Sequence, residues 1–456
     1  MMKLQKQTMT LALITTAIAA TLISAWGLSL FTSESPAASL PWQIYDQALY
    51  LSGFLSIGFM SITMMLAMRP AWLESPLKGL DQIYRLHKWS GILAVVFATL
   101  HWLIEMGDDV IKSIFGRAGR LHDQEFSGFI DMMRDAAEDI GEWAVYLLFV
   151  MLVLSLWKRF PYNLWRYLHR AMPALYLLLV FHSAWLAPLS WWQQPIGILI
   201  ALLMTGGSIA SLLSLRGKVG QARQVKATLL SVSDSIAGII EVKCQLENTW
   251  KGHRPGQFVL ITFDRLEGSH PFTIASSDNA NQQITLHIKA LGDYTNRLKT
   301  RLSIGQAITV EGPCGRFNFK PRKPNTVQTW VAAGIGITPF LSKLEALQNQ
   351  TNESQTDQPI LANLHYCTRD SVADPFVSHL QSACSDLPNI QLHIYDSGEN
   401  QRLTAEVLLA IHGENEREAM EVWFCGPSAF ANSLESSLRE RLNGRLYFHK
   451  EAFEFR

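Results

Sequence analysis

The feature that most constrains this chain is a series of long apolar segments in its first half. An α-helix needs about 20 residues to cross a bilayer, and segments of roughly that length lie at 11–31, 45–68, 84–105, 143–157, 164–186 and 196–215. After Arg216 the sequence has the mixed composition of a soluble protein. Backbone polar groups inside lipid must be satisfied within the segment itself, which a helix achieves. We therefore predict an all-α membrane bundle of six helices, followed by soluble domains.

Lysine and arginine are distributed unevenly among the loops between these segments. They occur in the loops after the second, fourth and sixth segments, whereas residues 32–44 and 187–195 contain none. Short positive loops stay on the cytosolic side, so we expect cytosolic termini, a cytosolic soluble half and an outward loop 106–142. Lys3 and Lys6 precede the first segment as in a signal peptide, but no clear cleavage site follows, so we expect a retained span. We expect the plasma membrane as the location.

Four histidines lie within two of the predicted spans. His87 and His101 are fourteen residues apart in the third span, and His169 and His182 are thirteen apart in the fifth. At about 1.5 Å per residue, each helix offers one imidazole near the inner face and another about 20 Å away near the outer face. Polar side chains within a span are costly and usually functional. We interpret them as ligands of two b-type haems, an inner one between His87 and His169 and an outer one between His101 and His182.

One alternative and one geometric difficulty accompany the haem interpretation. The histidines can instead be packing residues that hydrogen-bond neighbouring helices. Fourteen residues return a helix to nearly the same face, but thirteen leave the second imidazole about 140° away from the first. Pro173 lies between His169 and His182, and a proline kink there would correct the mismatch.

Composition argues against several functional classes. The formal net charge is zero and no Lys/Arg-rich tract is present, so the electrostatic footprint of nucleic-acid binding is missing. The five cysteines all lie in the second half, and no two have CxxC spacing. That pattern argues against a disulfide framework, a zinc knuckle or a thiolate-held iron–sulfur cluster, and fits a reducing compartment. We find no persuasive Ser-His-Asp or metallohydrolase motif and no EF-hand loop.

The soluble half divides into two patterns. Residues 218–323 contain short alternating runs bounded by Gly, Pro and Asp, which predict an antiparallel β-barrel. In residues 324–456, apolar strands alternate with helical stretches, which predicts a parallel α/β sheet. Gly334 and Gly336 stand where the first of these strands turns into a helix, a place where backbone amides can close on a phosphate. With residues 1–217 as the membrane domain, we predict three domains.

Short motifs in the soluble half occur in a diagnostic order. They are "RPGQFVLI", "HPFTIASS", "IKALGDYTNRL", "EGPCGRF", "AAGIGITPF", "HYCTRD", "FCGPSAF" and "FHKEAFEFR". In this order they resemble the ferredoxin–NADP⁺ reductase-type module that binds FAD and NADPH. Together with the paired histidines, whose spacings match as well, the chain over roughly residues 45–456 resembles the ferric reductase and NADPH oxidase superfamily.

The resemblance implies a set of cofactor-binding residues. For FAD these are His270, Pro271, Phe272, Thr273, Ser276 and Ser277 in the flavin signature, with Gly292 and Thr295 at the pyrophosphate. For NADPH they are Gly334, Gly336, Thr338 and Pro339 at the pyrophosphate, with Cys425, Gly426 and Pro427 beside the nicotinamide. Phe453 matches the aromatic that covers the flavin until nicotinamide displaces it, and Phe455 is a rival. Each of these aromatics can instead be a core residue, and Cys425 a small buried hydrophobe.

The same resemblance implies an electron path and a nucleotide. Electrons would pass from NADPH through FAD and the inner and outer haems to an acceptor at the outer face. Arg369 follows the second strand of the parallel sheet, where a positive side chain favours the 2′-phosphate of NADPH over NADH. Arg369 can instead be a solvated loop charge, so use of NADH stays open.

The acceptor is less constrained than the donor. Loop 106–142 is expected to cap the outer haem, with Trp102 and His122 as candidate lining residues. We favour Fe(III) chelates or a similar one-electron acceptor, with reduction of O₂ to superoxide as the second hypothesis. A haem module that passes electrons to a quinone or a periplasmic partner protein is the third. We predict no obligatory protein partner and no nucleic-acid binding.

Overall fold

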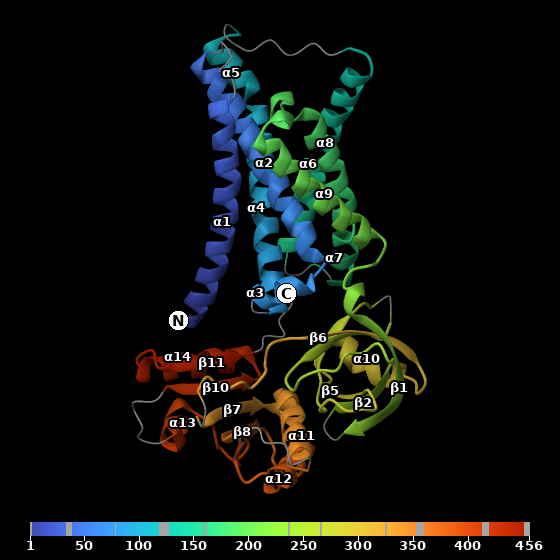
Figure 1. Ribbon diagram of the computed structural model, residues 1–456, viewed down its shortest axis with the longest axis vertical. Coiled ribbons are helices and arrows are strands. Elements are labelled where there is room, and N and C mark those ends of the chain that lie inside the picture. Colours follow the sequence, from blue (N-terminus) through green and yellow to red (C-terminus); the bar gives the residue numbers. More distant parts are fainter. Residues whose placement is uncertain are drawn as a thin grey trace. The chain divides into compact units, whose positions relative to one another are not determined.

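The structure separates into two compact units. The computed structural model describes residues 2–32, 39–77, 79–117, 127–157, 160, 162–235, 238–264, 267–323, 326–352, 360–412 and 419–450. The first unit, Met1–Gly220, is helical, and the second, Gln221–Arg456, contains the sheets (Figure 1). We call them the helical unit and the sheet unit. The predicted boundary at residue 217 is close to this division, whereas the boundary at residue 323 falls inside the sheet unit and stays a prediction.

The helical unit is built from long apolar helices. They are α1 Met2–Thr32, α2 Leu40–Ala67, α3 Ala71–Leu77, α4 Leu80–Met106, α5 Asp108–Phe115, α6 Phe129–Leu156, α7 Tyr162–His169, α8 Met172–Leu186 and α9 Pro195–Leu215. Within the described residues, four helical segments are long and apolar enough to cross a membrane: Leu11–Phe31, Leu40–Ala67, Leu80–Phe115 and Pro195–Leu215. A helical, apolar first half is thus confirmed, and six separate spans stay a prediction.

The fifth predicted span, 164–186, is not one continuous helix. It is divided into α7 and α8, and Pro173 lies in the first turn of α8. A proline ring clashes with the carbonyl four residues earlier, here that of His169, so the helix cannot run through this point. At the start of a helix the missing proline N–H has no intrahelical partner to lose. His169 and His182 therefore lie on different helices, and the mismatch calculated for one straight helix does not apply.

The core of the helical unit joins α2, α8 and α9. The hydroxyls of Tyr176 on α8 and Ser61 on α2 are 2.8 Å apart, and Tyr176 also donates to the Met204 carbonyl of α9 at 3.3 Å. A Cβ at position 207 would come closer than 3.0 Å to the Tyr176 hydroxyl oxygen, so Gly207 makes room for this ring. The buried polar contact fixes the three helices at one depth, since an unpaired hydroxyl would be costly there.

The first sheet of the sheet unit is antiparallel. Its strands are β1 Gln224–Ser235, β2 Ile239–Leu246, β3 Phe258–Thr262, β4 His270–Thr273, β5 Gln283–Lys289 and β6 Ala307–Cys314, and helix α10 is Asp293–Arg301. Six strands pair in the order β4-β3-β6-β1-β2-β5. In β5, Ile284, Leu286 and Ile288 are buried and alternate with less buried residues, which is the pattern of a strand covering a core on one face. The antiparallel arrangement is confirmed, and the closed barrel stays a prediction.

The second sheet is parallel and is covered by helices. Its strands are β7 Gln328–Ala333, β8 Ala362–Thr368, β9 Ile390–Asp396, β10 Met420–Cys425 and β11 Leu446–Lys450, and the helices are α11 Thr338–Asn352, α12 Pro375–Ser385, α13 Ala405–His412 and α14 Ser428–Arg441. The strand order is β11-β10-β7-β8-β9, as the alternating pattern predicts. The chain runs from β7 outward to β9 and returns to β10 on the other side of β7. The carboxyl ends of β7 and β10 therefore form the switch point at which such sheets bind ligands.

A buried histidine makes the stability of this sheet dependent on pH. His365 on β8 is 1% exposed, its Nδ1 lies 3.1 Å from the Tyr395 hydroxyl, and its ring stacks on His393 at 4.8 Å. Burial, and then the facing His393, lower the pKa of His365 to about 3. Below about pH 6.5, His365 binds a proton in the unfolded chain but stays neutral in the folded chain. We therefore expect stability to fall by up to roughly 1.4 kcal/mol per pH unit as the pH drops from about 6.5 toward 3.

The measurement is hydrogen exchange of the β8 amides in the full-length protein between pH 7 and pH 5, corrected for intrinsic exchange rates. His365→Gln should weaken the pH dependence of protection, because glutamine does not titrate. His379→Gln, at an exposed position on α12, is the matched control and should keep the wild-type slope. An unchanged slope in His365→Gln would contradict the assignment.

Candidate functional site

The helical unit brings the four predicted histidines together in two pairs. His87 of α4 and His169 at the end of α7 have ring centroids 6.2 Å apart, with an interplanar angle of 49°. His101 of α4 and His182 of α8 are also 6.2 Å apart, with an angle of 84°. The pairs are those expected from depth in the membrane. Two imidazoles from different helices face each other at each level.

Backbone carbonyls orient three of the four rings. Nδ1 of His87 donates to the Thr63 carbonyl at 3.0 Å, and Nδ1 of His101 donates to the Leu49 carbonyl at 2.9 Å. Both acceptors belong to α2. Nδ1 of His182 donates to the Ala137 carbonyl of α6 at 2.7 Å. Because a carbonyl only accepts, the proton of each neutral ring sits on Nδ1, which leaves Nε2 as the nitrogen able to ligate a metal.

The donor set fits a haem at each level. Metal–imidazole bonds are about 2.0 Å and a ring nitrogen lies about 1.1 Å from its centroid, so two imidazoles on one iron have centroids roughly 6.2 Å apart. The observed separations agree with this value. In the described part of the chain, no group of three or more His, Cys, Asp or Glu side chains can hold a bare metal ion. A haem needs only two protein ligands, because its macrocycle supplies the others.

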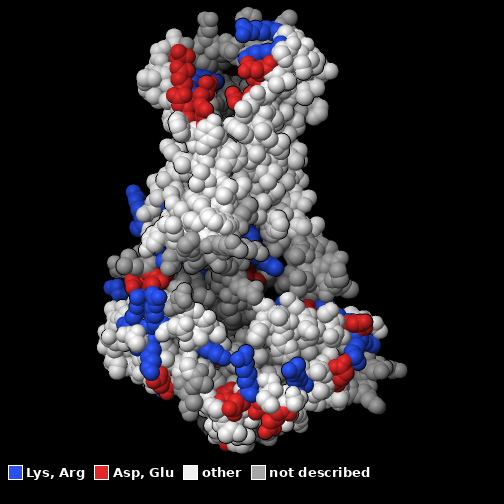
Figure 2. Space-filling model, turned by 180° about the vertical axis from the view of Figure 1, so that it is seen from behind, with Lys and Arg blue, Asp and Glu red and all other residues white. Residues whose placement is uncertain are grey.

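The end of the helical unit beside the His101–His182 pair is acidic. In the described parts of residues 105–142 the acidic side chains are Glu105, Asp108, Asp109, Asp131, Asp135, Glu138, Asp139 and Glu142, and the basic ones are Lys112, Arg117 and Arg134. Lys112 is paired with Asp108 and, at 3.5 Å, with Asp109. Figure 2 shows acidic side chains on both sides of a recess at this end. We call the eight acidic side chains named above the acidic rim.

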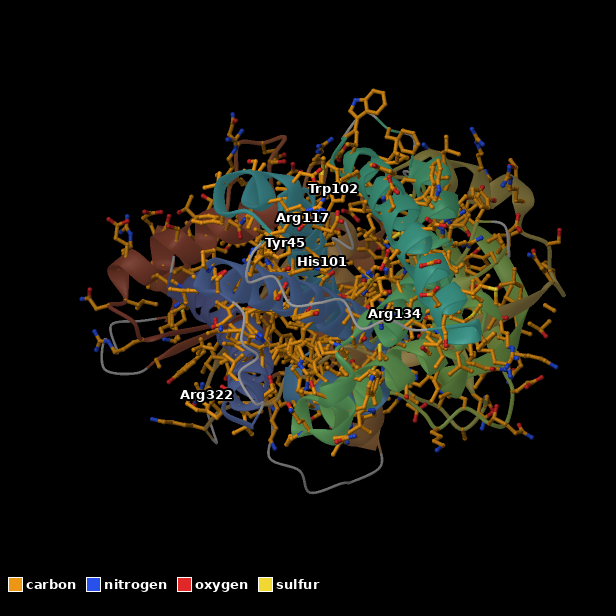
Figure 3. All side chains as sticks on the ribbon, turned by 90° about the horizontal axis from the view of Figure 1, so that it is seen from above. Tyr45, His101, Trp102, Arg117, Arg134 and Arg322 are labelled. Carbon is orange, nitrogen blue, oxygen red and sulfur yellow. The ribbon has the colours of Figure 1, made fainter. Side chains whose placement is uncertain are left out.

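Helix-to-helix contacts shape the same end. The Tyr45 hydroxyl of α2 donates to the Glu105 carbonyl of α4 at 3.4 Å, and Arg134 of α6 donates to the Trp185 carbonyl of α8 at 2.8 Å. The predicted lining residue Trp102 packs against Phe149 of α6 with ring centroids 5.4 Å apart. Figure 3 looks down on this end and shows His101, Trp102 and Tyr45 near one another in that view. His122 lies outside the described residues.

In the sheet unit, the predicted FAD residues fall on β4 and at the start of α10. His270, Pro271, Phe272 and Thr273 make up β4. The His270 ring stacks on Tyr294 with centroids 3.9 Å apart and an angle of 13°. Burial raises the pKa of Tyr294 to about 12, so this ring stays neutral.

The turn that leads into α10 is closed by a threonine. The backbone amide of Gly292 donates to the Thr295 hydroxyl at 3.1 Å, and Leu291 donates to the same oxygen at 2.9 Å. This cap fixes the N-terminal turn of α10, and amides at a helix N-terminus bind phosphate groups. A pyrophosphate at Gly292 and Thr295 is compatible with this geometry and stays a prediction.

Ser276 and Ser277 lie between the two sheets of the unit. The Ser276 hydroxyl accepts from the Thr285 amide at 3.0 Å, and the Ser277 hydroxyl accepts from the Asn349 side chain of α11 at 3.0 Å. The Ser277 amide donates to Glu345 of α11 at 2.7 Å. Both serines are buried, and both hydroxyls are engaged with protein groups. Their direct contribution here is to connect the antiparallel sheet to the first helix of the parallel sheet.

The predicted NADPH loop sits at the switch point of the parallel sheet. Gly334 follows β7 with a φ of +54°, a conformation that favours glycine. A Cβ at position 336 would come closer than 3.0 Å to the carbonyl oxygen of Cys425 at the end of β10, so Gly336 allows the two strand ends to touch. The Thr338 hydroxyl donates to the Ile335 carbonyl at 3.1 Å, and Pro339 lies in the first turn of α11. Helix α11 thus points its N-terminus at this loop.

Residues around the switch point complete the candidate nucleotide site. Cys425 is buried at the end of β10, and Gly426 and Pro427 connect it to α14. Arg369 follows β8 and is exposed. Sequence reasoning missed Lys289 at the end of β5, whose Nζ is 4.0 Å from where a Cβ on Gly334 would lie. The sequence signal that could have identified Lys289 is its position, as a basic residue, just before the "LGDYT" turn. Phe453 and Phe455 lie outside the described residues.

Two protein families match the chain, one in each unit. The family of the ferric reductase like transmembrane component matches residues 52–180, and an FAD-binding domain family matches residues 223–359. The first match includes His87, His101 and His169 and ends two residues before His182. The second begins at the residue before β1 and extends past the Gly334–Gly336 loop.

Individual relatives agree with these families. Respiratory burst oxidase homolog protein E of Arabidopsis thaliana is 21% identical over 396 residues, covering 64% of this chain and 40% of the relative. Ferric reduction oxidase 4 of the same plant is 31% identical over 133 residues, covering 27% of this chain and 19% of the relative. The chain therefore spans well under two thirds of either relative.

Among solved structures, ferredoxin-NADP⁺ reductase from Plasmodium falciparum aligns with 50% of this chain and 96% of its own. The identity is 16% and the TM-score 0.41, which is too low to establish a shared fold. The family matches and the relatives converge on one group. The chain belongs to the ferric reductase and NADPH oxidase superfamily of flavin-dependent oxidoreductases.

Proposed function

We propose that this protein carries electrons from cytosolic NADPH across a membrane to a one-electron acceptor at the outer face. The observation that carries the proposal is the pairing of four imidazoles at two depths, each pair at a centroid separation of 6.2 Å. Two stacked ligand pairs serve electron passage across the bilayer, since one pair would reach only part of its thickness. The inner pair is His87–His169 and the outer pair His101–His182. The location is the plasma membrane, with cytosolic termini.

The sheet unit supplies the electron donor. When bound, FAD takes two electrons together as hydride and releases them singly to haem iron, which carries one at a time. The residues of β4 and the N-terminal turn of α10 bind the flavin and its pyrophosphate. The Gly334–Gly336 loop and the N-terminus of α11 bind the NADPH pyrophosphate, where helix amides favour anions. Lys289 adds positive charge beside Gly334.

Two further residue roles belong to the proposal. Arg369 follows β8 on the solvent side, where its guanidinium selects the 2′-phosphate of NADPH. Phe453, with Phe455 as its rival, covers the flavin ring in the absence of nicotinamide. Cys425 and Gly426 flank the nicotinamide at the end of β10.

The experiment is an optical spectrum of the detergent-purified full-length protein under nitrogen, before and after NADPH. The expected result is sharp reduced b-type haem bands that appear on NADPH addition without another protein. Admitting air and, separately, a ferric chelate then ranks the acceptors by the rate of haem reoxidation. A protein without haem, or haem that NADPH cannot reduce, would refute transmembrane electron transfer and leave a membrane-anchored flavin reductase.

We propose an Fe(III) complex or a similar one-electron acceptor at the outer face, with O₂ as the second candidate. O₂ stays a candidate because one relative, from Dictyostelium discoideum, is named as the heavy chain of a superoxide-generating NADPH oxidase. The acidic rim favours neutral or cationic acceptors over anionic chelates, because like charges repel an approaching anion. Oxygen is neutral and is indifferent to the rim.

The charge preference gives a prediction about salt. Reoxidation of pre-reduced haem by hexaammineruthenium(III), a cation, should slow on addition of salt, and reoxidation by ferricyanide, an anion, should accelerate. The Debye length shrinks from about 30 Å at 0.01 M salt to about 8 Å at 0.15 M, so the rim is screened. We expect opposite changes of about tenfold in the two rates, measured by stopped flow.

His182→Ala provides the baseline for this measurement, because it disables the outer pair and leaves only reactions at the flavin and the inner level. Its rates are subtracted from those of the wild-type protein. Equal salt dependence for the two acceptors after subtraction would show that the acidic rim does not govern access. A rate with O₂ that is faster than both and independent of salt would favour the oxidase hypothesis.

A further inference from the structure

The two histidines of the outer pair, His101 and His182, share a local pattern on the helices that orient them. His182 donates to the Ala137 carbonyl of α6 at 2.7 Å, and the residue four positions later in α6 is Gly141. His101 donates to the Leu49 carbonyl of α2 at 2.9 Å, and the residue four positions later is Gly53. Both outer ligands therefore use a carbonyl whose i+4 neighbour is glycine.

The geometry of an α-helix explains why the i+4 position matters. The carbonyl of residue i already accepts the amide of residue i+4, and the side chain of residue i+4 stands beside the remaining lone pair. Serine and threonine at i+4 use that lone pair with their own hydroxyls. A donor from another helix must enter the same space. A glycine at residue i+4 leaves that space open for the incoming donor.

The two glycines differ in how much room they leave. A Cβ at position 141 would come closer than 3.0 Å to Nδ1 and Cε1 of His182, a separation that real Cβ atoms essentially never show. A Cβ at position 53 would lie 3.1 Å from Nδ1 and Cε1 of His101, which is tight but within reach of a small shift. Alanine at position 141 therefore displaces the imidazole, whereas alanine at position 53 only presses on it.

Both glycines clear space for an imidazole rather than for helix packing. The three atoms nearest to the Cβ position are all from His182 at position 141 and all from His101 at position 53. Gly197, by contrast, faces the backbone of Trp191 and Trp192. Gly58, on the same helix as Gly53, faces the flexible side chain of Leu22, also at 3.1 Å.

We propose that Gly141 and Gly53 are positioning residues for the two ligands of the outer haem, with Gly141 the more stringent. They act through the Nδ1–carbonyl hydrogen bonds, which set ring orientation and ligand basicity. The inference rests on the proposed function, since it needs iron between His101 and His182. The inner level differs. His87 donates to the Thr63 carbonyl at 3.0 Å, and the residue four positions after Thr63 is Ala67 rather than glycine.

The test compares Gly141→Ala, Gly53→Ala and Gly58→Ala in the full-length protein, using dithionite redox titration and electron paramagnetic resonance of the ferric haems. Gly141→Ala should lose one low-spin signal or convert it to high spin. Gly53→Ala should keep two low-spin haems and shift the potential and g-values of one. Gly58→Ala introduces a Cβ at the same 3.1 Å separation on the same helix, but against leucine, and should match the wild type.

The outcomes separate the inference from the proposed function. Wild-type protein without haem would refute the function and the inference together. Two haems in the wild type, with Gly141→Ala and Gly53→Ala both matching it, would overturn the inference alone. Loss of flavin reduction by NADPH in Gly141→Ala would indicate that this variant fails to fold. In that case the test is the comparison of haem potential and g-values between Gly53→Ala and Gly58→Ala. Equal shifts in those two would reduce the glycines to general packing residues and overturn the inference.

Discussion

Replacing His101 or His182 with alanine is expected to lower the haem content from about two per chain to about one and to abolish electron delivery to outer-face acceptors. These histidines face each other at 6.2 Å, and each is oriented by a backbone carbonyl. Without one imidazole, a haem at the outer level would have a single protein ligand in place of two. The remaining inner haem should still be reduced by NADPH.

The measurements are a pyridine haemochrome assay and the extent of haem reduction by NADPH under nitrogen. His87→Ala should produce the complementary result, in which the surviving outer haem is reduced by dithionite but not by NADPH. His379→Ala, at an exposed position on α12, controls for histidine loss as such and should retain the wild-type haem content and reduction. Retention of both haems in His101→Ala and in His182→Ala would contradict the assignment of the outer pair.

The pairing of the histidines could be predicted because it depends on their spacing along the sequence. The rise of a helix converts the positions of His87 and His101 into two depths, and a second segment supplies mates at the same depths. A kink between His169 and His182 could be predicted from the sequence, since Pro173 removes an amide and clashes with the carbonyl of His169. The division of this segment into two helices, α7 and α8, could not be predicted, because it depends on packing against the other helices.

The partners that orient the rings could not be predicted. Thr63, Leu49 and Ala137 act through backbone carbonyls, and every residue has one, so the side chains give no signal. Gly53 and Gly141 are visible as glycines, but a glycine in an apolar helix is also a common packing residue. Only the three-dimensional contacts show that these two face imidazoles.

In the sheet unit, local patterns predicted the strands and the glycine turn but not the connections between sheets. Alternation of buried residues in β5 and the apolar run of β7 specify an antiparallel and a parallel sheet. Ser277 illustrates the limit, because its hydroxyl contacts Asn349, which is 72 positions away. Lys289 was likewise missed, since its neighbour Gly334 follows β7, a strand of the other sheet.

Gly336→Ala is expected to raise the KM for NADPH by about tenfold to a hundredfold. A Cβ at this position would meet the Cys425 carbonyl oxygen and the Gly426 amide nitrogen closer than 3.0 Å. These are backbone atoms of a strand end and cannot rotate away as a side chain would. Forcing an extra carbon into a packed site costs roughly 1–3 kcal/mol, and about 1.4 kcal/mol is a factor of ten in affinity.

The readout separates the nucleotide site from the rest of the electron path. Steady-state rates at varied NADPH should show the loss, whereas reduction of the haems by dithionite should be unchanged because it bypasses the loop. Gly27→Ala is the matched control, since nothing lies within 4 Å of its Cβ position on α1, and it should keep the wild-type KM. If Gly336→Ala also keeps the wild-type KM, the close approach of β7 and β10 does not shape the nucleotide site, and NADPH must bind elsewhere on the sheet unit.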